Sequence, residues 1–171
     1  MERTILYFAY GSNLWPPRMR ARVPSAVSLG CHRLDGFRLR FGKRGADGSA
    51  KADIHFTGDT CHAVYGAVYL MLEAERPVLD RIEGGYNRAS VLLGSKRDEL
   101  RAFTYIAAEP VDEEYAPFDW YRQLLLAGGR HHDLPTGYLQ RIAGVETVAD
   151  PDAHRHAANW PASLPDPFPL I

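Results

Sequence analysis

The chain has 171 residues and a formal net charge of −1 at pH 7, with a sequence pI near 6.6. Because its charges are nearly balanced, the composition does not indicate a surface for nucleic acid or for an anionic membrane, and a small-molecule ligand is the better expectation. A chain of this length can bury a core without disulfides or metal, so we expect one domain over residues 1–150. The proline-rich residues 151–171 are expected to wrap the surface without regular structure.

Targeting and cysteine signals are weak throughout the sequence. The chain starts with "MERTILYFAY" and contains no apolar stretch of about 18 residues, so we expect a cytoplasmic protein with no membrane segment, present as a monomer or a homodimer. Cys31 and Cys61 lie far apart and outside C-x-x-C spacing. This pattern predicts two buried thiols and neither a zinc site nor a redox pair.

The first predicted element is a buried strand that ends abruptly. Residues 5–10 form an apolar and aromatic run, and Gly11, Ser12 and Asn13 follow it directly. Gly11 permits backbone angles closed to other residues, and serine and asparagine side chains bond to nearby backbone, so this sequence predicts a sharp turn. Two interpretations remain open: an ordinary turn, or a row of backbone N–H groups that holds an anion.

Residues 14–72 are expected to form mainly strands. Phe37, Leu39 and Phe41 recur with a period of two, as on one face of a strand. The expected elements are a short helix opened by Pro16-Pro17 and closed before Pro24, strands over 25–34 and 36–43, a mobile loop over 44–53, and a central strand over 62–72. Within the central strand, Gly66 indicates close approach of a backbone or a ligand.

The second half of the chain changes to a helical period. Val78, Leu79 and Ile82 fall on one face of a helix that Gly84-Gly85 ends. Beyond it we expect a hairpin of strands 88–96 and 100–108 around the charged turn Lys96–Glu99, and then two helices within 117–146, the first ending at Gly128-Gly129 and the second beginning near Pro135.

Glu83 occupies an unusual position at the end of its predicted helix. The helix dipole disfavours a negative charge there by about 0.3–1 kcal/mol. Glu83 also follows Leu79 by four residues, which places it beside the apolar face. Both effects raise a carboxyl pKa toward the range of about 6–7 that suits a general acid or base at neutral pH. The alternative is a solvated glutamate at a frayed helix end.

Several segments together resemble the γ-glutamylcyclotransferase (AIG2-like) family. They are "YFAYGSNL" (7–14), "PSAVSLGCHRLDGFRLRF" (24–41), "VYGAVYLM" (64–71), "LDRIEG" (79–84) and "WYRQLLLAGGRHHDLPTGYLQRI" (120–142). The resemblance spans roughly residues 5–147 and implies an α+β fold, a mixed β-barrel with flanking helices. It implies Glu83 as the catalytic acid/base, Tyr121 as a substrate contact, and a substrate loop of Tyr7, Phe8, Ala9, Tyr10, Gly11, Ser12, Asn13 and Leu14. Whether Tyr86 contributes to the site stays open.

The activity that the resemblance implies is formation of 5-oxoproline from a γ-glutamyl amino acid or amine, with release of the free amine. This reaction needs neither a cofactor nor a metal. Two alternatives are a glutathione-preferring relative and a non-catalytic binding module. Leucine follows the serine in the glutathione-specific relatives, whereas Asn13 follows Ser12 here.

Two other kinds of site have weaker support in the sequence. The histidines form two short groups, His131-His132 and the pair His154 and His156, with no coherent set of metal ligands, so we expect surface histidines. Ser12 as a hydrolase nucleophile would need a base, and its surroundings do not match the G-x-S-x-G pattern.

Overall fold

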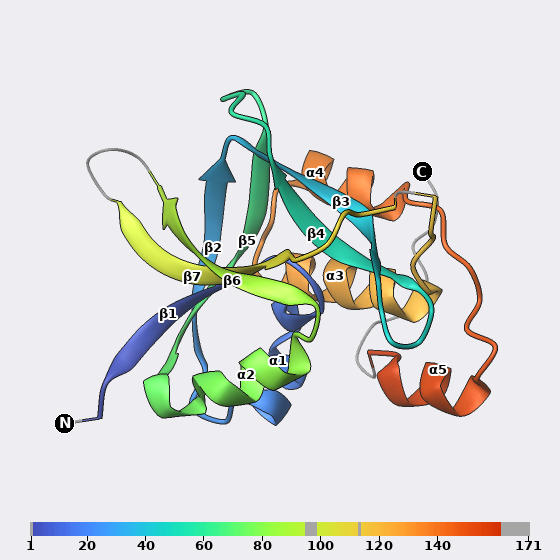
Figure 1. Cartoon of the computed structure of the whole chain (residues 1–171), viewed down its shortest axis with the longest axis horizontal. Coiled ribbons are helices and arrows are strands. Elements are labelled where there is room, and N and C mark those ends of the chain that lie inside the picture. The colour runs from blue at the N-terminus through green and yellow to red at the C-terminus, as the bar shows by residue number, and fades with distance from the viewer. Residues whose placement is uncertain (1, 95–98, 113, 162–171) are drawn as a thin grey trace.

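The computed structural model describes residues 2–94, 99–112 and 114–161, and combines a five-stranded sheet with a two-stranded ribbon and flanking helices (Figure 1). The strands are β1 (Thr4–Ala9), β2 (Val27–Asp35), β3 (Phe37–Arg44), β4 (Ala50–Phe56), β5 (Ala63–Leu72), β6 (Tyr86–Leu93) and β7 (Leu100–Ala107). The α-helices are α1 (Pro16–Arg22), α2 (Arg76–Ile82), α3 (Asp119–His131), α4 (Thr136–Ala143) and α5 (Ala153–Asn159), and short 3₁₀ turns occur at η1 (Ser12–Leu14) and η2 (Glu73–Glu75). The fold is therefore of the mixed α+β class.

Strand β1 lies at the centre of the large sheet, whose order is β2-β5-β1-β7-β6. It pairs antiparallel with β5, from Thr4 opposite Leu72 to Ala9 opposite Ala67, and parallel with β7. Strand β5 pairs with both β2 and β1, as the sequence predicted. A Cβ on Gly66 would lie 2.3 Å from the carbonyl oxygen of Ala9, so the close backbone approach expected there is confirmed.

The expected closed barrel is not confirmed. Strands β3 and β4 pair with each other as a separate ribbon, and within the described ranges no strand pairing joins β2 to β6. The two edges do approach at one point, where the Gly94 N–H donates to the Arg33 carbonyl oxygen over 3.4 Å. The sheet is therefore strongly curved without a continuous ring of hydrogen bonds.

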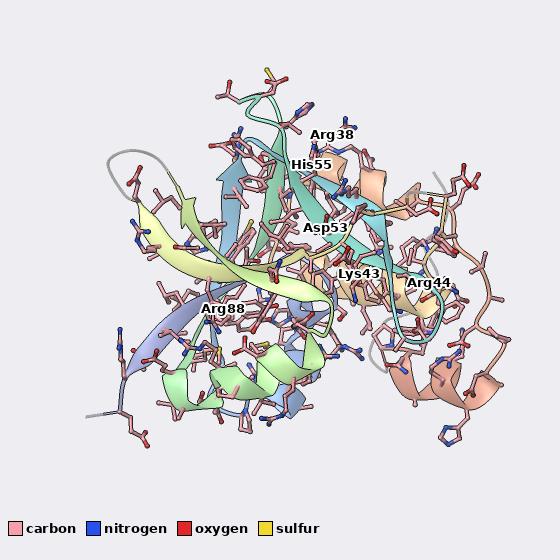
Figure 2. All side chains as sticks on the ribbon, in the orientation of Figure 1. Arg38, Lys43, Arg44, Asp53, His55 and Arg88 are labelled. Atoms are coloured by element: carbon pink, nitrogen blue, oxygen red, sulfur yellow. The ribbon has the colours of Figure 1, made fainter. Side chains whose placement is uncertain are left out.

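The mobile loop expected over 44–53 is wrong, because Arg44 belongs to β3 and residues 50–53 belong to β4. The loop proper is residues 45–49. Strand β4 begins where Ala50 pairs with Arg44, and its Asp53 side chain is fully buried (Figure 2). Asp53 accepts hydrogen bonds from Arg40 on β3 and, over 2.7 Å, from the backbone of Ala107 on β7. Asp53 thereby fastens the ribbon to the sheet.

The two glycines expected to end α3 lie inside it, and the helix continues to His131. A Cβ on Gly128 would lie 2.4 Å from the backbone carbon of Leu14. The missing side chain lets α3 lie directly against the η1 turn. The glycines therefore allow close packing, and the expected helix end at this point is wrong.

The C-terminal segment is partly helical, so the expectation of irregular structure is wrong for α5. The Asp152 carboxylate caps this helix by accepting from the Arg155 N–H over 2.9 Å. The Asp150 carboxylate bonds both Arg155 and the Trp120 indole N–H, which attaches the segment to α3. Residues 162–171, and residues 95–98, on which most of the turn expected at Lys96–Glu99 falls, lie outside the described residues.

Three expectations about side-chain exposure also need correction. Cys31 and Cys61 are free and exposed rather than buried. Ile82, expected on the apolar face of α2, is 42% exposed, because α2 ends there at the edge of a groove. His132 is buried, with its Nε2 3.0 Å from the Tyr69 hydroxyl.

None of the helices in the described part of the chain is long and apolar enough to cross a lipid bilayer.

Candidate active site

A small cavity of about 30 Å³, here called the inner cavity, lies where β1 turns into η1. Its lining comes from five parts of the chain: Tyr7, Tyr10, Gly11, Ser12, Asn13, Ala52, Glu83, Tyr86, Tyr105 and Tyr121. A larger depression of about 510 Å³, here called the outer groove, adjoins it and shares Ser12, Glu83, Tyr86 and Tyr121. The two spaces form one concave site, and in the inner cavity tyrosine rings surround a single carboxylate, that of Glu83.

Glu83 supplies that carboxylate from the residue that follows α2. Its N–H donates to the Leu79 carbonyl over 2.8 Å, which holds the backbone in the last helical turn. Its side chain is 18% exposed, and its Oε1 accepts from the Asn13 amide over 2.9 Å. Its Oε2 accepts no hydrogen bond from the residues that the structure describes, so this oxygen is available to a ligand.

Burial raises the pKa of the Glu83 carboxyl above its ordinary value. The positive charge of Arg22, 3.7 Å from Oε1, and the Asn13 hydrogen bond both act in the opposite direction. The net direction is upward, as the helix-end position predicted, although the main cause is burial by the surrounding walls. A carboxyl shifted in this direction is suited to exchanging a proton near neutral pH.

Asn13 connects the turn to the carboxylate. It is 3% exposed, and its side-chain N–H groups donate to the Tyr7 hydroxyl over 3.0 Å and to Glu83. Its carbonyl oxygen accepts from Arg22 on α1 over 2.7 Å. These three bonds use the whole amide, so Asn13 holds Glu83, Tyr7 and Arg22 in one fixed arrangement.

Two tyrosines hold the ribbon against the site through a single residue, Ala52. The Ala52 N–H donates to the Tyr121 hydroxyl over 3.1 Å, and the Tyr86 hydroxyl donates to the Ala52 carbonyl over 2.7 Å. Both rings line the inner cavity. The structure thus places Tyr86 in the site, a point that the sequence left open.

The Gly11 turn is sharp for a different reason from the one expected. Gly11 has φ −105°, which is outside the left-handed region that favours glycine. A Cβ there would lie 3.3 Å from the Tyr121 hydroxyl, so glycine leaves room inside the cavity. The first hydrogen bond of the 3₁₀ turn runs from the Leu14 N–H to the Gly11 carbonyl oxygen. The backbone N–H groups that precede Leu14 in the turn therefore have no partner within it.

Not every residue of the expected substrate loop faces the cavity. Phe8, Ala9 and Leu14 are fully buried in the core. The Leu14 carbonyl accepts from the Tyr69 hydroxyl over 3.1 Å, which anchors the turn from behind. These three residues support the loop, whereas Tyr7, Tyr10, Gly11, Ser12 and Asn13 line the inner cavity.

Sequence reasoning missed Ala52, Tyr105 and the arginines of α1. Arg18 and Arg22 are four residues apart on a helix bounded by prolines, so they share one face, and this spacing could have predicted their proximity. The position of Ala52 had no comparable local signal. Among the described residues no group of three or more His, Cys, Asp or Glu side chains is arranged to hold a metal ion.

Comparison with known proteins gives the same family from sequence and from structure. A model of the AIG2-like family matches residues 63–142. The chain is 28% identical over 156 residues to γ-glutamylcyclotransferase of Homo sapiens, and this match covers 85% of this chain and 80% of that protein. It is 29% identical over 154 residues to γ-glutamylcyclotransferase of Mus musculus, and this match covers 84% of this chain and 79% of that protein. A solved structure of a γ-glutamyl cyclotransferase superposes with a TM-score of 0.77 and 26% identity, covering 85% of this chain and 90% of the other. The chain is therefore similar to γ-glutamylcyclotransferases in both sequence and fold.

The segment that matches the AIG2-like model contains only part of the site. The residues matched by the AIG2-like model include Glu83, Tyr86 and Tyr121. The turn of residues 7–14 precedes that segment, and the fold brings it to the same cavity through Asn13 and Glu83. The carboxylate and the turn are therefore two halves of one site.

Proposed function

We propose that the protein is a γ-glutamylcyclotransferase, which converts a γ-glutamyl amino acid or amine to 5-oxoproline and the free amine. In this reaction the α-amine of the substrate attacks its own γ-carbonyl carbon. A C–N bond forms in the five-membered ring, and the bond between the γ-carbon and the leaving nitrogen breaks. Holding an amine and a carbonyl of one molecule in contact is worth on the order of 7–11 kcal/mol in well-oriented reactions.

Glu83 is proposed to move the proton. The α-amine is mainly protonated at neutral pH, and Oε2 of Glu83 can take its proton because Glu83 lines the cavity and this oxygen has no partner among the described residues. The same carboxyl then delivers a proton to the departing nitrogen. Asn13 and Arg22 hold the other oxygen in place throughout.

The turn is proposed to bind negative charge on the substrate. The N–H groups at the start of η1 can donate to the α-carboxylate or to the oxyanion that forms on the γ-carbonyl. The inner cavity, about 30 Å³, holds only a small part of such a substrate. The substrate therefore extends into the outer groove, and the leaving amine lies there.

The observation that carries this proposal is the buried Glu83 carboxylate in the cavity wall, with one oxygen fixed by Asn13 and the other without a partner among the described residues. The direct test is to incubate the purified protein with a panel of γ-glutamyl amino acids, γ-glutamyl amines and glutathione, and to measure 5-oxoproline by chromatography. We expect 5-oxoproline and free amine in equal amounts. Glutamate as the main early product would show hydrolysis instead, and binding without any product would show a non-catalytic module.

A further inference from the structure

The outer groove is strongly cationic. Its positively charged lining residues are Arg18, Arg22, Lys43, Lys51, Arg81 and Arg155, whereas its only carboxylates within the described part of the chain are Asp47 and Glu83. Six positive charges around two negative ones produce a positive potential in a confined space, and such a potential attracts anions.

Three of these cations already have carboxylate partners. Lys51 lies 2.7 Å from Asp47, Arg155 lies 2.7 Å from Asp150, and Arg22 lies 3.7 Å from Glu83. Within each pair the two charges neutralise each other, so these three cations attract an anionic ligand only weakly.

Arg18, Lys43 and Arg81 form no ion pair with a carboxylate of a described residue. Arg81 is exposed, whereas Arg18 and Lys43 are half-buried. The Arg18 guanidinium donates to the neutral Asn159 amide over 2.9 Å, and its Nε is buried with no partner in residues 2–94, 99–112 and 114–161. Burial lowers the pKa of Arg18 to about 10. A buried, unsatisfied guanidinium N–H is costly to maintain, so its presence in the wall of a groove indicates an anionic ligand.

Lys43 reaches the groove from the end of β3. Its ammonium donates to the Gly84 carbonyl over 2.8 Å and lies 4.6 Å from the centre of the Tyr86 ring. Both contacts place the charge beside the site without neutralising it. Lys43 and Arg18 also each lower the pKa of Glu83, which shows that both charges act at the proposed reaction centre.

We propose that the leaving amine is an acidic amino acid, whose two carboxylates bind Lys43 and Arg18 in the outer groove. This inference rests on the proposed function. Where the turn takes the α-carboxylate of the glutamyl part, the groove cations remain for the leaving group. A neutral amino acid would engage one of them and leave the other unpaired, and an amine without a carboxylate would leave both unpaired.

The test compares γ-glutamylaspartate with γ-glutamylasparagine, two substrates of nearly equal shape that differ by one charge. We measure kcat/KM for each by formation of 5-oxoproline. We expect γ-glutamylaspartate to be preferred about tenfold or more at low ionic strength. The preference should shrink as salt is added, because screening weakens interactions between charges.

Variants assign the preference to its residues. Lys43→Met and Arg18→Met should each reduce the ratio of the two kcat/KM values toward one, whatever happens to the rate on either substrate. Arg38→Met is the matched control, because Arg38 lies on the same strand as Lys43 but outside the outer groove (Figure 2). It removes an equal charge and should leave the ratio unchanged.

The outcomes separate the inference about an acidic leaving group from the proposed cyclotransferase function. Equal kcat/KM for the two substrates in the parent, or an equal loss of preference in Arg38→Met and Lys43→Met, would overturn the inference. So would turnover of γ-glutamyl amines when neither of these two peptides reacts. Absence of 5-oxoproline from every γ-glutamyl compound would instead refute the proposed function itself.

Discussion

Replacing Glu83 with glutamine changes one atom of the side chain and removes its ability to accept a proton. The structure indicates that the amide fits without rearrangement. Its oxygen can keep the Oε1 position, where Asn13 donates over 2.9 Å, and its NH₂ group then occupies the Oε2 position, which has no donor among the described residues facing it. Glu83→Gln therefore isolates proton transfer from shape.

We expect turnover to fall by about 10²–10⁴-fold in Glu83→Gln, the usual contribution of a positioned general base. This range corresponds to about 2.7–5.5 kcal/mol in the activation barrier. KM should change much less, because the site keeps its shape. The assay is kcat and KM by 5-oxoproline formation. Glu146→Gln serves as the control, since Glu146 is exposed beyond α4 and should retain the parental rate.

The same variant makes a separate prediction for stability. The folded-state pKa of Glu83 is raised, so ionising it destabilises the folded chain as pH rises past the ordinary glutamate pKa, and this cost persists at higher pH. Glu83→Gln lacks the cost and should melt no lower than the parent at pH 7–8. The difference should narrow as the pH falls below the ordinary glutamate pKa. Full activity, or a large drop in melting temperature at neutral pH, would refute the reasoning.

Three further predictions concern pH, substrate and packing. Arg22→Met removes the positive charge 3.7 Å from Glu83, so the rising limb of kcat/KM against pH should move to higher pH, and a shift to lower pH would contradict the assignment. A γ-glutamyl substrate acetylated on its α-amine should release no amine, because the nucleophile is blocked; amine release measured by chromatography would indicate attack by water. Gly128→Ala should lower stability by about 1–3 kcal/mol in thermal or denaturant melts, because its Cβ would overlap Leu14. Gly137→Ala in α4 has open space, so it should be neutral or stabilising by up to about 1 kcal/mol, and equal losses in both variants would exclude the packing explanation.

Local sequence signals predicted the elements that carry their own pattern. The strand, the turn and the proline-opened helix over residues 4–22 follow from an apolar run and two helix-start prolines, and they form as expected. Strand β4 was missed because its sequence, AKADIHF, begins with alanine and charge rather than with β-branched residues. It is stabilised by partners far along the chain, since Asp53 bonds Arg40 and the backbone of Ala107.

In the candidate site, too, contacts between residues far apart in the sequence could not be predicted. Glu83 could be selected as a candidate because a negative charge at a helix end is unfavourable for a structural residue, and the structure places it in the cavity lining. Its contact with Asn13 joins residues 70 positions apart, and no local pattern reports such a contact. Gly128 illustrates the reverse error: glycine in a helical sequence suggests an end, but here the tertiary contact with Leu14 requires it.

The separation of the β3–β4 ribbon from the large sheet has a consequence for how this molecule can diversify. Glu83 and the turn belong to parts packed on the large sheet, whereas Lys43 and Lys51 belong to a ribbon fastened by Asp53 and by the tyrosine bonds to Ala52. Insertions or charge changes in the ribbon and its 45–49 loop leave the sheet's hydrogen-bond ladder intact. Under the proposed function, selection can therefore change the preference for the leaving amine without altering Glu83 or the turn.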